Sequence, residues 1–274
     1  MLDGVHVGRR PRTGSLPRVA THSYLEHPGP LAIAHRGGTE SAPENTLAAF
    51  RAATELGFRY LETDVHLTAD GVLVAFHDDE LDRVTDGSGR IADLPWSEVR
   101  RAKIGGTEPV PTLDELLEEF PDTRFNIDPK SDHVVVALVA TLKRHGALDR
   151  VCVGAFSDER LRRVRSLAGP ELCTAAGPRE ITALVAASRT GGVAGGSNDG
   201  VGYRCLQIPV RHLKVELATP QFVAAAHQRG HQVHVWTIDE AAEMHRLLDL
   251  GVDGLMTDRP SVLRSVLEER GSWA

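Results

Sequence analysis

The sequence has few cysteines and no long apolar run. Its 274 residues include only three cysteines, Cys152, Cys173 and Cys205. Because this number is odd, the spacing fits no metal-binding motif and each cysteine lies in an apolar segment, we predict buried free thiols in a reducing compartment, the cytoplasm. No apolar stretch approaches the roughly 18 residues of a membrane span, so we expect no stable membrane insertion.

Positive charge is also in short supply. The chain carries 31 Lys and Arg residues against 38 Asp and Glu residues, which gives a formal net charge of -7. There is no basic stripe with interleaved aromatic residues, and this excludes a typical nucleic-acid-binding surface. An anionic small-molecule substrate would therefore need a few well-placed cations or a metal ion to bind.

Two segments differ from a regular domain pattern at the level of composition. Residues 1–30 are rich in Arg, Pro and Gly and lack the continuous apolar block of a secretory signal, which predicts a flexible N-terminal arm. Residues 190–204 are dense in glycine without the strand-to-helix context of a nucleotide-binding loop, which predicts a mobile connection.

Short aliphatic runs alternate with helix-like segments through residues 31–274. These runs begin near residues 31, 59, 125, 151, 172, 204, 234 and 253. Alternation of strand and helix implies a parallel sheet. Eight such units in a chain of this length predict an α/β fold, a closed (β/α)₈ TIM barrel.

A ninth apolar run, VLVAF at residues 72–76, interrupts the alternation. It follows the second strand too closely for a crossover helix, and the turn signal TADG lies between the two, so we predict a hairpin. The return arm of this hairpin would bring His77 back beside Glu62 and Asp64. Residues 79–110, which follow, are longer than a normal barrel loop and predict a small insertion, either a stabilising flap or one wall of the substrate cleft.

Acidic side chains end two of the predicted strands. Glu62 and Asp64 are two residues apart, so strand alternation points both carboxylates the same way, toward one hard cation. Asp128 ends the next strand and could supply a third oxygen ligand. A single Glu-x-Asp pair is more often a solvated strand end. Three acids beside two histidines and two cations at one face of a barrel favour a metal site, because crowded carboxylates repel one another unless a cation neutralises them.

These motifs together resemble the glycerophosphodiester phosphodiesterase family. The resemblance covers AHRGG and PENT, LETDV, TADGVLVAFHD, LDRVTDGSGRI, PTLDELL, FNIDPK, VWTI and DGLMTDRP, in the family's order, from residue 31 to residue 260. It implies a TIM barrel that uses one divalent cation, Mg²⁺ or Ca²⁺ with Mn²⁺ as another possibility. It also implies hydrolysis of a small-molecule glycerophosphodiester to an alcohol and sn-glycerol 3-phosphate, a reaction of lipid and glycerol metabolism.

The resemblance also implies roles for individual residues. His35 and His77 match the family's general acid and base, and Arg36 matches its phosphate-contacting arginine, with Lys130 as a second cation. Glu62, Asp64 and Asp128 match the metal ligands. In the third position the family most often has glutamate; aspartate is shorter by one methylene, which bears on metal choice and affinity more than on reaction class.

The chemistry of phosphodiester cleavage fits this set of residues. The metal with Arg36 and Lys130 can neutralise the phosphate oxygens. Two histidines, one neutral and one protonated, can activate a nucleophile and protonate the leaving alkoxide. By the same resemblance, the nucleophile is either the substrate's own glycerol hydroxyl, through a cyclic phosphate, or water.

Several residues outside these motifs carry weaker signals. Trp236, at the end of a predicted strand, either stacks on the glycerol or head group or belongs to the core. Gln207 is a candidate polar contact. The histidines of the last third show no ligand spacing that fits the barrel face, so we expect them on the surface: His212, His227, His231, His234 and His245.

Two other functions are compatible with the same motifs. A phospholipase D-like barrel enzyme would cleave a lysophospholipid or sphingolipid and would need an exposed apolar loop, which the sequence does not indicate. A non-hydrolytic phosphodiester-binding protein would be expected to lack one of the two histidines, and both are present. No pattern in the sequence indicates the head group of the substrate or an oligomeric state.

Overall fold

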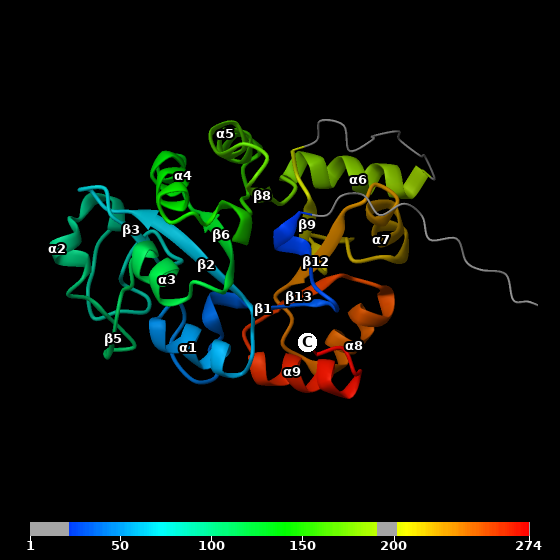
Figure 1. Ribbon diagram of the computed structural model, residues 1–274, viewed down its shortest axis with the longest axis horizontal. Helices are drawn as coiled ribbons and strands as arrows, with labels where there is room; N and C mark the ends of the chain where they lie inside the picture. Colours follow the sequence, from blue (N-terminus) through cyan, green and yellow to red (C-terminus); the bar gives the residue numbers. More distant parts are fainter. Residues whose placement is uncertain (1–21, 191–201, 274) are drawn as a thin grey trace, which may run out of the picture.

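The computed structural model describes residues 22–190 and 202–273, and its parallel strands form the predicted TIM barrel (Figure 1). Hydrogen-bonded neighbours follow the order β8-β7-β6-β2-β1-β13-β12-β9. The strands of the barrel are β1 (Leu31–Ala34), β2 (Tyr60–Leu67), β6 (Arg124–Pro129), β7 (Val151–Val153), β8 (Cys173–Thr174), β9 (Cys205–Pro209), β12 (Gln232–Trp236) and β13 (Gly254–Thr257).

The barrel closes least completely between β8 and β9. A single parallel bridge joins Ala175 to Cys205, and two further backbone hydrogen bonds support it, from Ala176 to Cys205 at 2.8 Å and from Arg204 to Thr174 at 2.9 Å. We refer to this junction as the β8–β9 seam. Most of the glycine-dense connection predicted at residues 190–204 lies just before β9 and outside the described residues.

Helices connect the strands and surround the barrel. They are α1 (Leu47–Glu55), α3 (Leu113–Glu119), α4 (Val134–Arg144), α5 (Asp158–Ala168), α6 (Pro178–Thr190), α7 (Pro220–His227), α8 (Ala241–Leu250) and α9 (Pro260–Glu269), with a short 3₁₀ helix η4 (Leu148–Arg150) before β7. Side-chain caps start several of them; Thr112, for example, accepts from the Glu115 N–H while Glu115 accepts from the Thr112 N–H, a reciprocal capping box. In the described part of the chain, no helix is both long and apolar enough to cross a membrane.

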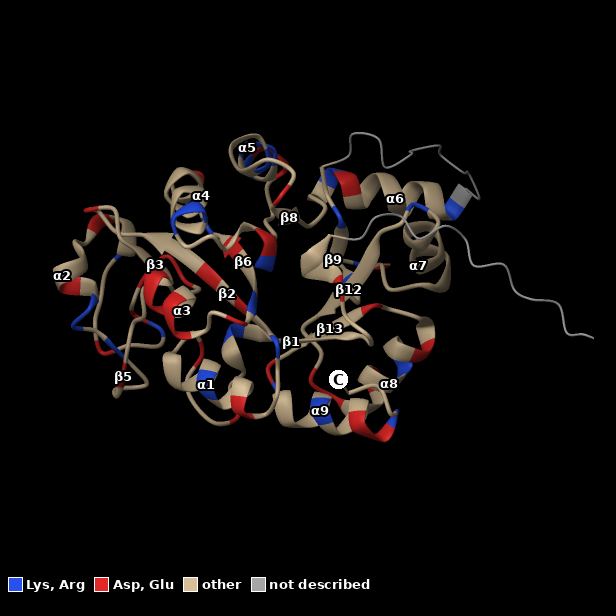
Figure 2. Cartoon of the chain, viewed as in Figure 1, with Lys and Arg blue, Asp and Glu red and all other residues tan. Residues whose placement is uncertain are grey.

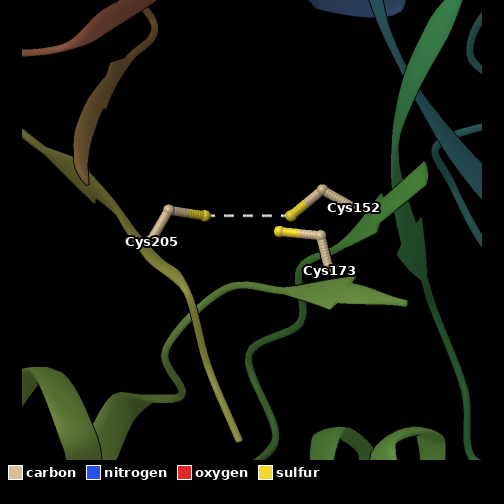
Figure 3. Close-up of side chains that lie close together, drawn as sticks. All are labelled: Cys152, Cys173 and Cys205. Carbon is tan, nitrogen blue, oxygen red and sulfur yellow. Dashed lines mark hydrogen bonds between the residues drawn. The ribbon is translucent and has the colours of Figure 1, made fainter. Parts of the chain in front are cut away.

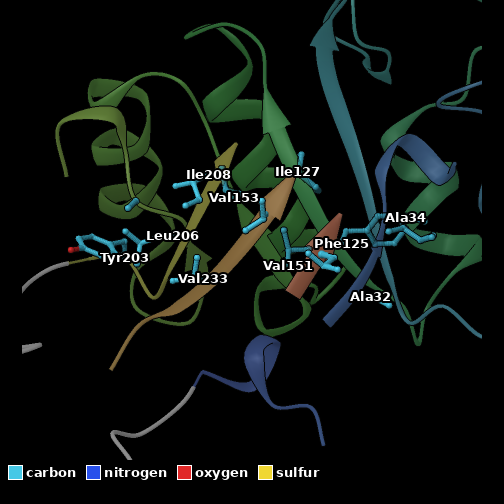
Figure 4. Close-up of a cluster of buried hydrophobic side chains, with 14 of the residues drawn as sticks. Ala32, Ala34, Phe125, Ile127, Val151, Val153, Tyr203, Leu206, Ile208 and Val233 are labelled. Atoms are coloured by element: carbon cyan, nitrogen blue, oxygen red, sulfur yellow. The ribbon is translucent and has the colours of Figure 1, made fainter. Parts of the chain in front are cut away.

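Strand alternation divides the apolar residues into two clusters. Ala32, Ala34, Phe125 and Ile127 pack outward against the helices (Figure 4), whereas Leu31, Ile33 and Tyr60 belong to a separate cluster inside the barrel. Apolar side chains therefore fill the barrel near the N-terminal ends of its strands, and the polar site can form only toward their C-terminal ends.

The N-terminal end of the barrel is closed by a segment that precedes β1. The 3₁₀ helix η1 (Ser23–Leu25) places Tyr24, which is fully buried, edge-on against Tyr60 with ring centroids 5.3 Å apart. The Tyr60 hydroxyl donates to the Tyr24 carbonyl at 2.9 Å. The predicted arm of residues 1–30 is therefore too long, because residues 22–30 pack on the barrel; residues 1–21 lie outside the described residues.

The predicted hairpin is confirmed. Strand β3 (Leu73–Ala75) pairs antiparallel with β2, with Val65 opposite Ala75 and Leu67 opposite Leu73. The insertion that follows contains the 3₁₀ helix η3 (Ile91–Asp93), α2 (Trp96–Val99), and the paired strands β4 (Lys103–Ile104) and β5 (Glu108–Pro109). It has its own apolar cluster, in which Leu81, Ile91, Val99 and Ile104 pack against Phe76.

Candidate active site

The His-Arg-Gly-Gly segment turns sharply at the C-terminal end of β1. It forms the 3₁₀ helix η2 (His35–Gly37), in which Arg36 takes a left-handed conformation with φ of 52°. Gly38 has φ of 85°, and a Cβ there would lie 2.5 Å from a ring carbon of Pro260, so only glycine fits. This turn directs the Arg36 N–H to the Glu62 carboxylate at 2.9 Å and sets His35 beside it.

Three carboxylates are crowded on neighbouring strands, two within β2 and one near the end of β6, and Figure 2 shows acidic positions on both strands. Asp64 and Asp128 are direct partners in the parallel register, and Glu62 precedes Asp64 by two residues. Burial, together with the charge of Asp64, raises the pKa of Glu62 to about 7. Burial also raises the pKa of Asp128, and its Oδ1 is buried without a hydrogen-bond partner among the described residues.

Two cationic side chains approach these acids. The Lys130 ammonium lies 2.6 Å from Asp64 and 3.0 Å from Asp128, and its pKa is raised because these two carboxylates outweigh the lowering effect of burial. The Arg36 guanidinium lies between Asp64, 3.3 Å from Nε, and Glu44, 2.9 Å from Nη1.

The donor set fits a hard divalent cation. Glu62, Asp64 and Asp128 offer only carboxylate oxygens, which such cations prefer. A cation would also give a partner to the unpaired Asp128 Oδ1 and would offset the burial and the repulsion from Asp64 that together raise the Glu62 pKa.

His35 is held by an acidic residue from β13's C-terminal end. Its Nδ1 donates to Asp258 Oδ1 at 2.7 Å, and its Nε2 lies 3.8 Å from Glu62 Oε2. Burial alone would lower the pKa of His35, but the negative charges of Glu62 and Asp258 outweigh it, so the pKa is raised. Because Nδ1 is engaged by Asp258, Nε2 remains the nitrogen available to a substrate.

His77 has a matching carboxylate partner on Nδ1. The hairpin returns it to the level of Asp64, whose carbonyl accepts the preceding backbone N–H of Phe76 at 3.0 Å. His77 Nδ1 donates to Asp78 Oδ1 at 2.5 Å. The guanidinium of Arg83 binds Asp78 and, together with the hydrogen bond from His77, lowers the pKa of Asp78 to about 2. The structure thus gives both histidines a carboxylate partner on Nδ1.

A cavity of about 520 Å³ joins these groups. Every site residue predicted from the sequence lines it: His35, Arg36, Glu62, Asp64, His77, Asp128, Lys130 and Trp236. Gln207 also lines it and donates to Asn126 at 2.8 Å. No residue of 79–110, all of which the structure describes, lines the cavity, so the interpretation of this insertion as a cleft wall has no support here.

Most of the remaining cavity wall is apolar, although Thr182, Arg189 and His212 also line it. It comes from α6 and from the segment around the short paired strands β10 (Arg211–His212) and β11 (Val215–Glu216), through Ile181, Val185 and Leu217. At the rim, Phe156 is 71% exposed and Leu213 is 88% exposed, and Phe156 packs edge-on against Trp236. These two exposed apolar residues stand alone on separate loops, so they form no apolar run in the sequence.

The sequence analysis did not find four residues that support the site. Asp258 binds His35, and Arg83 binds Asp78, the partner of His77. Glu44 binds Arg36, and Asn45 donates to Asp64 at 3.3 Å. All four lie within the runs PENT, LDRVTDGSGRI and DGLMTDRP. Their position inside the runs that carry the family resemblance was the signal that could have identified them.

Surface placement is wrong for two of the predicted surface histidines. His231 is 4% exposed and His234 is fully buried. Strand β12 directs His234 into the barrel interior. The sequence analysis had found no spacing that would give this histidine a partner there.

Known proteins resemble this chain along most of its length. Residues 35–262 match the glycerophosphoryl diester phosphodiesterase family. A protein of Mycobacterium tuberculosis named probable glycerophosphodiester phosphodiesterase 2 is 41% identical over 92% of this chain and 96% of its own length. A rat lysophospholipase D is 27% identical over 86% of this chain and 85% of its own length.

Solved structures agree with the fold. A protein of Silicibacter pomeroyi named "putative glycerophosphoryl diester phosphodiesterase" superposes with a TM-score of 0.76 at 26% identity, covering 92% of this chain and all of the other. A phosphodiesterase of Oleispira antarctica, in complex with the product sn-glycerol 3-phosphate, superposes with a TM-score of 0.72 at 27% identity over 87% of this chain and 97% of the other.

Proposed function

Because the chain belongs to the glycerophosphoryl diester phosphodiesterase family, we propose that it hydrolyses glycerophosphodiesters to an alcohol and sn-glycerol 3-phosphate. One observation carries this proposal. Two histidines, each fixed through Nδ1 by a carboxylate, line the same cavity as three crowded acids and two cations.

In this reaction His35 and His77 move the protons. Their Nδ1 atoms are bound to Asp258 and Asp78, so each ring is oriented with Nε2 left to the substrate. One histidine removes the proton from the attacking hydroxyl, and the other gives a proton to the leaving alkoxide. Such acid–base catalysis typically contributes about 10²–10⁴-fold to the rate.

The acids would hold a metal ion, and the two cationic side chains bind the phosphate. Glu62, Asp64 and Asp128 would hold a divalent cation, which when bound supplies positive charge to the phosphate oxygens. Arg36 and Lys130 lie against the same carboxylates and orient the phosphate from the protein side. Trp236 lines the adjoining wall, where the rest of the substrate would pack.

The test is release of glycerol 3-phosphate from glycerophosphocholine and glycerophosphoethanolamine. The protein is stripped with a chelator, and Mg²⁺, Ca²⁺ or Mn²⁺ is restored one at a time. We expect metal-dependent release. His227→Ala is the matched control for substitution of His35 or His77, because His227 also pairs with an acid, Asp253 at 2.8 Å, but lies outside the cavity lining. Folded protein that releases no product with any cation would contradict the proposal.

A lysophospholipid is the second candidate substrate class, and the apolar side of the cavity favours it. An acyl chain could pack along Ile181 and Val185 and leave the cavity past the exposed Phe156 and Leu213. Phe156→Ser should then lower turnover of lysophosphatidylcholine while leaving that of glycerophosphocholine unchanged. Equal effects on both substrates would exclude this assignment.

We place the enzyme in a reducing compartment such as the cytoplasm. The supporting observation is that all three cysteines are unpaired thiols.

A further inference from the structure

Three thiols meet inside the barrel (Figure 3), and none of them lines the catalytic cavity. Cys152 and Cys173 are direct partners on β7 and β8, and Cys205 faces them from β9 across the β8–β9 seam. Their Sγ atoms all lie within 4.8 Å of one another, and all three residues are completely buried. The chain has no other cysteine.

The spacing of the sulfurs fits coordination better than a disulfide. Sγ of Cys152 lies 3.8 Å from Sγ of Cys205, whereas a disulfide bond is about 2.05 Å long. Around a zinc ion with Zn–S bonds of about 2.3 Å, two tetrahedral thiolates lie about 3.8 Å apart.

A histidine beside the thiols lacks a partner on one ring nitrogen. His234 is fully buried and its Nε2 donates to the Gln232 side-chain oxygen at 3.1 Å, so its Nδ1 carries a lone pair. This Nδ1 is buried without a hydrogen-bond partner among the described residues. The His234 ring helps the two neighbouring thiols keep the pKa of Cys205 well below its usual value. The ligand atoms that lie within 4.8 Å of one another are the three sulfurs alone, so Nδ1 of His234 would have to move toward them to complete a four-ligand site.

The closing tyrosine provides a second unpaired polar atom. The Tyr24 hydroxyl is buried and has no hydrogen-bond partner in the described part of the chain. Burial, reinforced by nearby Cys152 and Cys173, raises the pKa of Tyr24 well above its usual value, so its hydroxyl stays protonated as a donor. Buried polar atoms are rarely left unpaired, and two such atoms around one thiol cluster indicate a missing ligand.

We propose that Cys152, Cys173, Cys205 and His234 bind a structural zinc ion inside the barrel. Three thiolates and one imidazole are a known tetrahedral donor set for zinc and differ from the all-oxygen set of the catalytic site. Zinc binding releases the thiol protons, and the Tyr24 hydroxyl then donates to a coordinating sulfur. The ion would join β7, β8 and β9 at the β8–β9 seam, where a single bridge pairs the described residues of the two strands.

The test uses protein expressed in minimal medium with Zn²⁺, and in parallel with Co²⁺, in a Glu62→Gln, Asp64→Asn background that removes two carboxylates of the oxygen site. We expect one zinc ion per chain by mass spectrometry of the native protein. The cobalt form should show a thiolate-to-cobalt charge-transfer band and the intense visible bands of a tetrahedral site. Because the chain has no other thiols, this band reports the cluster alone.

Variants identify the ligands. Cys205→Ser should abolish the charge-transfer band, and His234→Gln should weaken zinc retention by about 10–100-fold, while His227→Gln, away from the cluster, should retain both. If a cysteine variant fails to fold, the zinc content and the cobalt spectrum of the protein with all three cysteines still test the proposal. The proposal would be overturned if the Glu62→Gln, Asp64→Asn protein retained no zinc, showed no charge-transfer band and had three thiols that all react with a thiol reagent after unfolding without chelator.

Discussion

The Asp258→Asn substitution tests how far catalysis depends on the orientation of His35. Asp258 accepts the Nδ1 proton of His35 at 2.7 Å and does not itself line the cavity. An amide keeps the size of the carboxylate but loses its charge. It can also present its NH₂ group to Nδ1, which would move the imidazole proton to Nε2, the wrong nitrogen for a base.

The size of the effect follows from this hydrogen bond. A hydrogen bond to a charged partner contributes about 1.5–3 kcal/mol, and about 1.4 kcal/mol corresponds to a factor of ten in rate. The Asp258 side chain is 32% exposed, which weakens the interaction and favours the lower end of the range. We therefore expect kcat/KM to fall about 10–30-fold, less than the loss on removing His35 itself.

The assay is glycerol 3-phosphate release across a pH series with metal at saturation. KM should change little, because Asp258 does not face the substrate. Glu62 and Asp258 raise the pKa of His35 against the lowering effect of burial, so the limb that reports His35 should move to lower pH in the variant. Asp253→Asn, which alters the acid paired with His227 outside the cavity, is the matched control.

Two results would refute this account of Asp258. One is an Asp258→Asn enzyme with unchanged kcat/KM while His35→Ala is inactive. The other is a loss of activity with an unshifted pH profile and a lowered melting temperature, which would make Asp258 a structural residue only.

Three further predictions address the site and the barrel. His35→Ala and His77→Ala should each lower kcat by about 10²-fold or more with the fold retained by circular dichroism, and full activity of either would exclude the acid–base assignment. In metal-free protein the pKa of the Glu62 carboxyl is raised from 4.5 to about 7, so the protonated carboxyl favours folding below pH 4.5. This contribution to the free energy of unfolding, on the order of 3 kcal/mol, is lost as the pH rises through 7. Denaturant titration at several pH values should show this loss, and Glu62→Gln should remove it. Tyr24→Ala should lower the free energy of unfolding by about 3–5 kcal/mol, whereas Phe156→Ala, at an exposed side chain, should change it by less than about 0.5 kcal/mol, and equal values would contradict the closing role of Tyr24.

The strand pattern and the strand ends were predictable from sequence because they obey local rules. Period-two alternation points Glu62 and Asp64 the same way, and the C-terminal ends of parallel strands lie on one face of the barrel. The sequence alone therefore predicted that the main site residues lie close together. The antiparallel return of β3 placed His77 in the same way.

Contacts between distant segments were not predictable by those rules. Asp258 is 223 positions from His35 along the chain, and no periodicity links them. The thiol cluster is similar, because Cys152, Cys173 and Cys205 meet only through strand register and barrel closure. The apolar rim escaped notice since Phe156 and Leu213 stand alone in polar loops.

The packing of Tyr24 also bears on how the domain should be delimited in the laboratory. The family match starts at residue 35 and β1 starts at Leu31, so either boundary would remove the 3₁₀ helix that closes the lower end of the barrel. A truncated protein that starts at Leu31 would expose Leu31, Ile33 and Tyr60 to water, and one that starts at residue 35 would lose β1 as well, so both would be prone to aggregate. Expression designs, fusions and tag positions should therefore retain residues 22–30 as part of the folded unit.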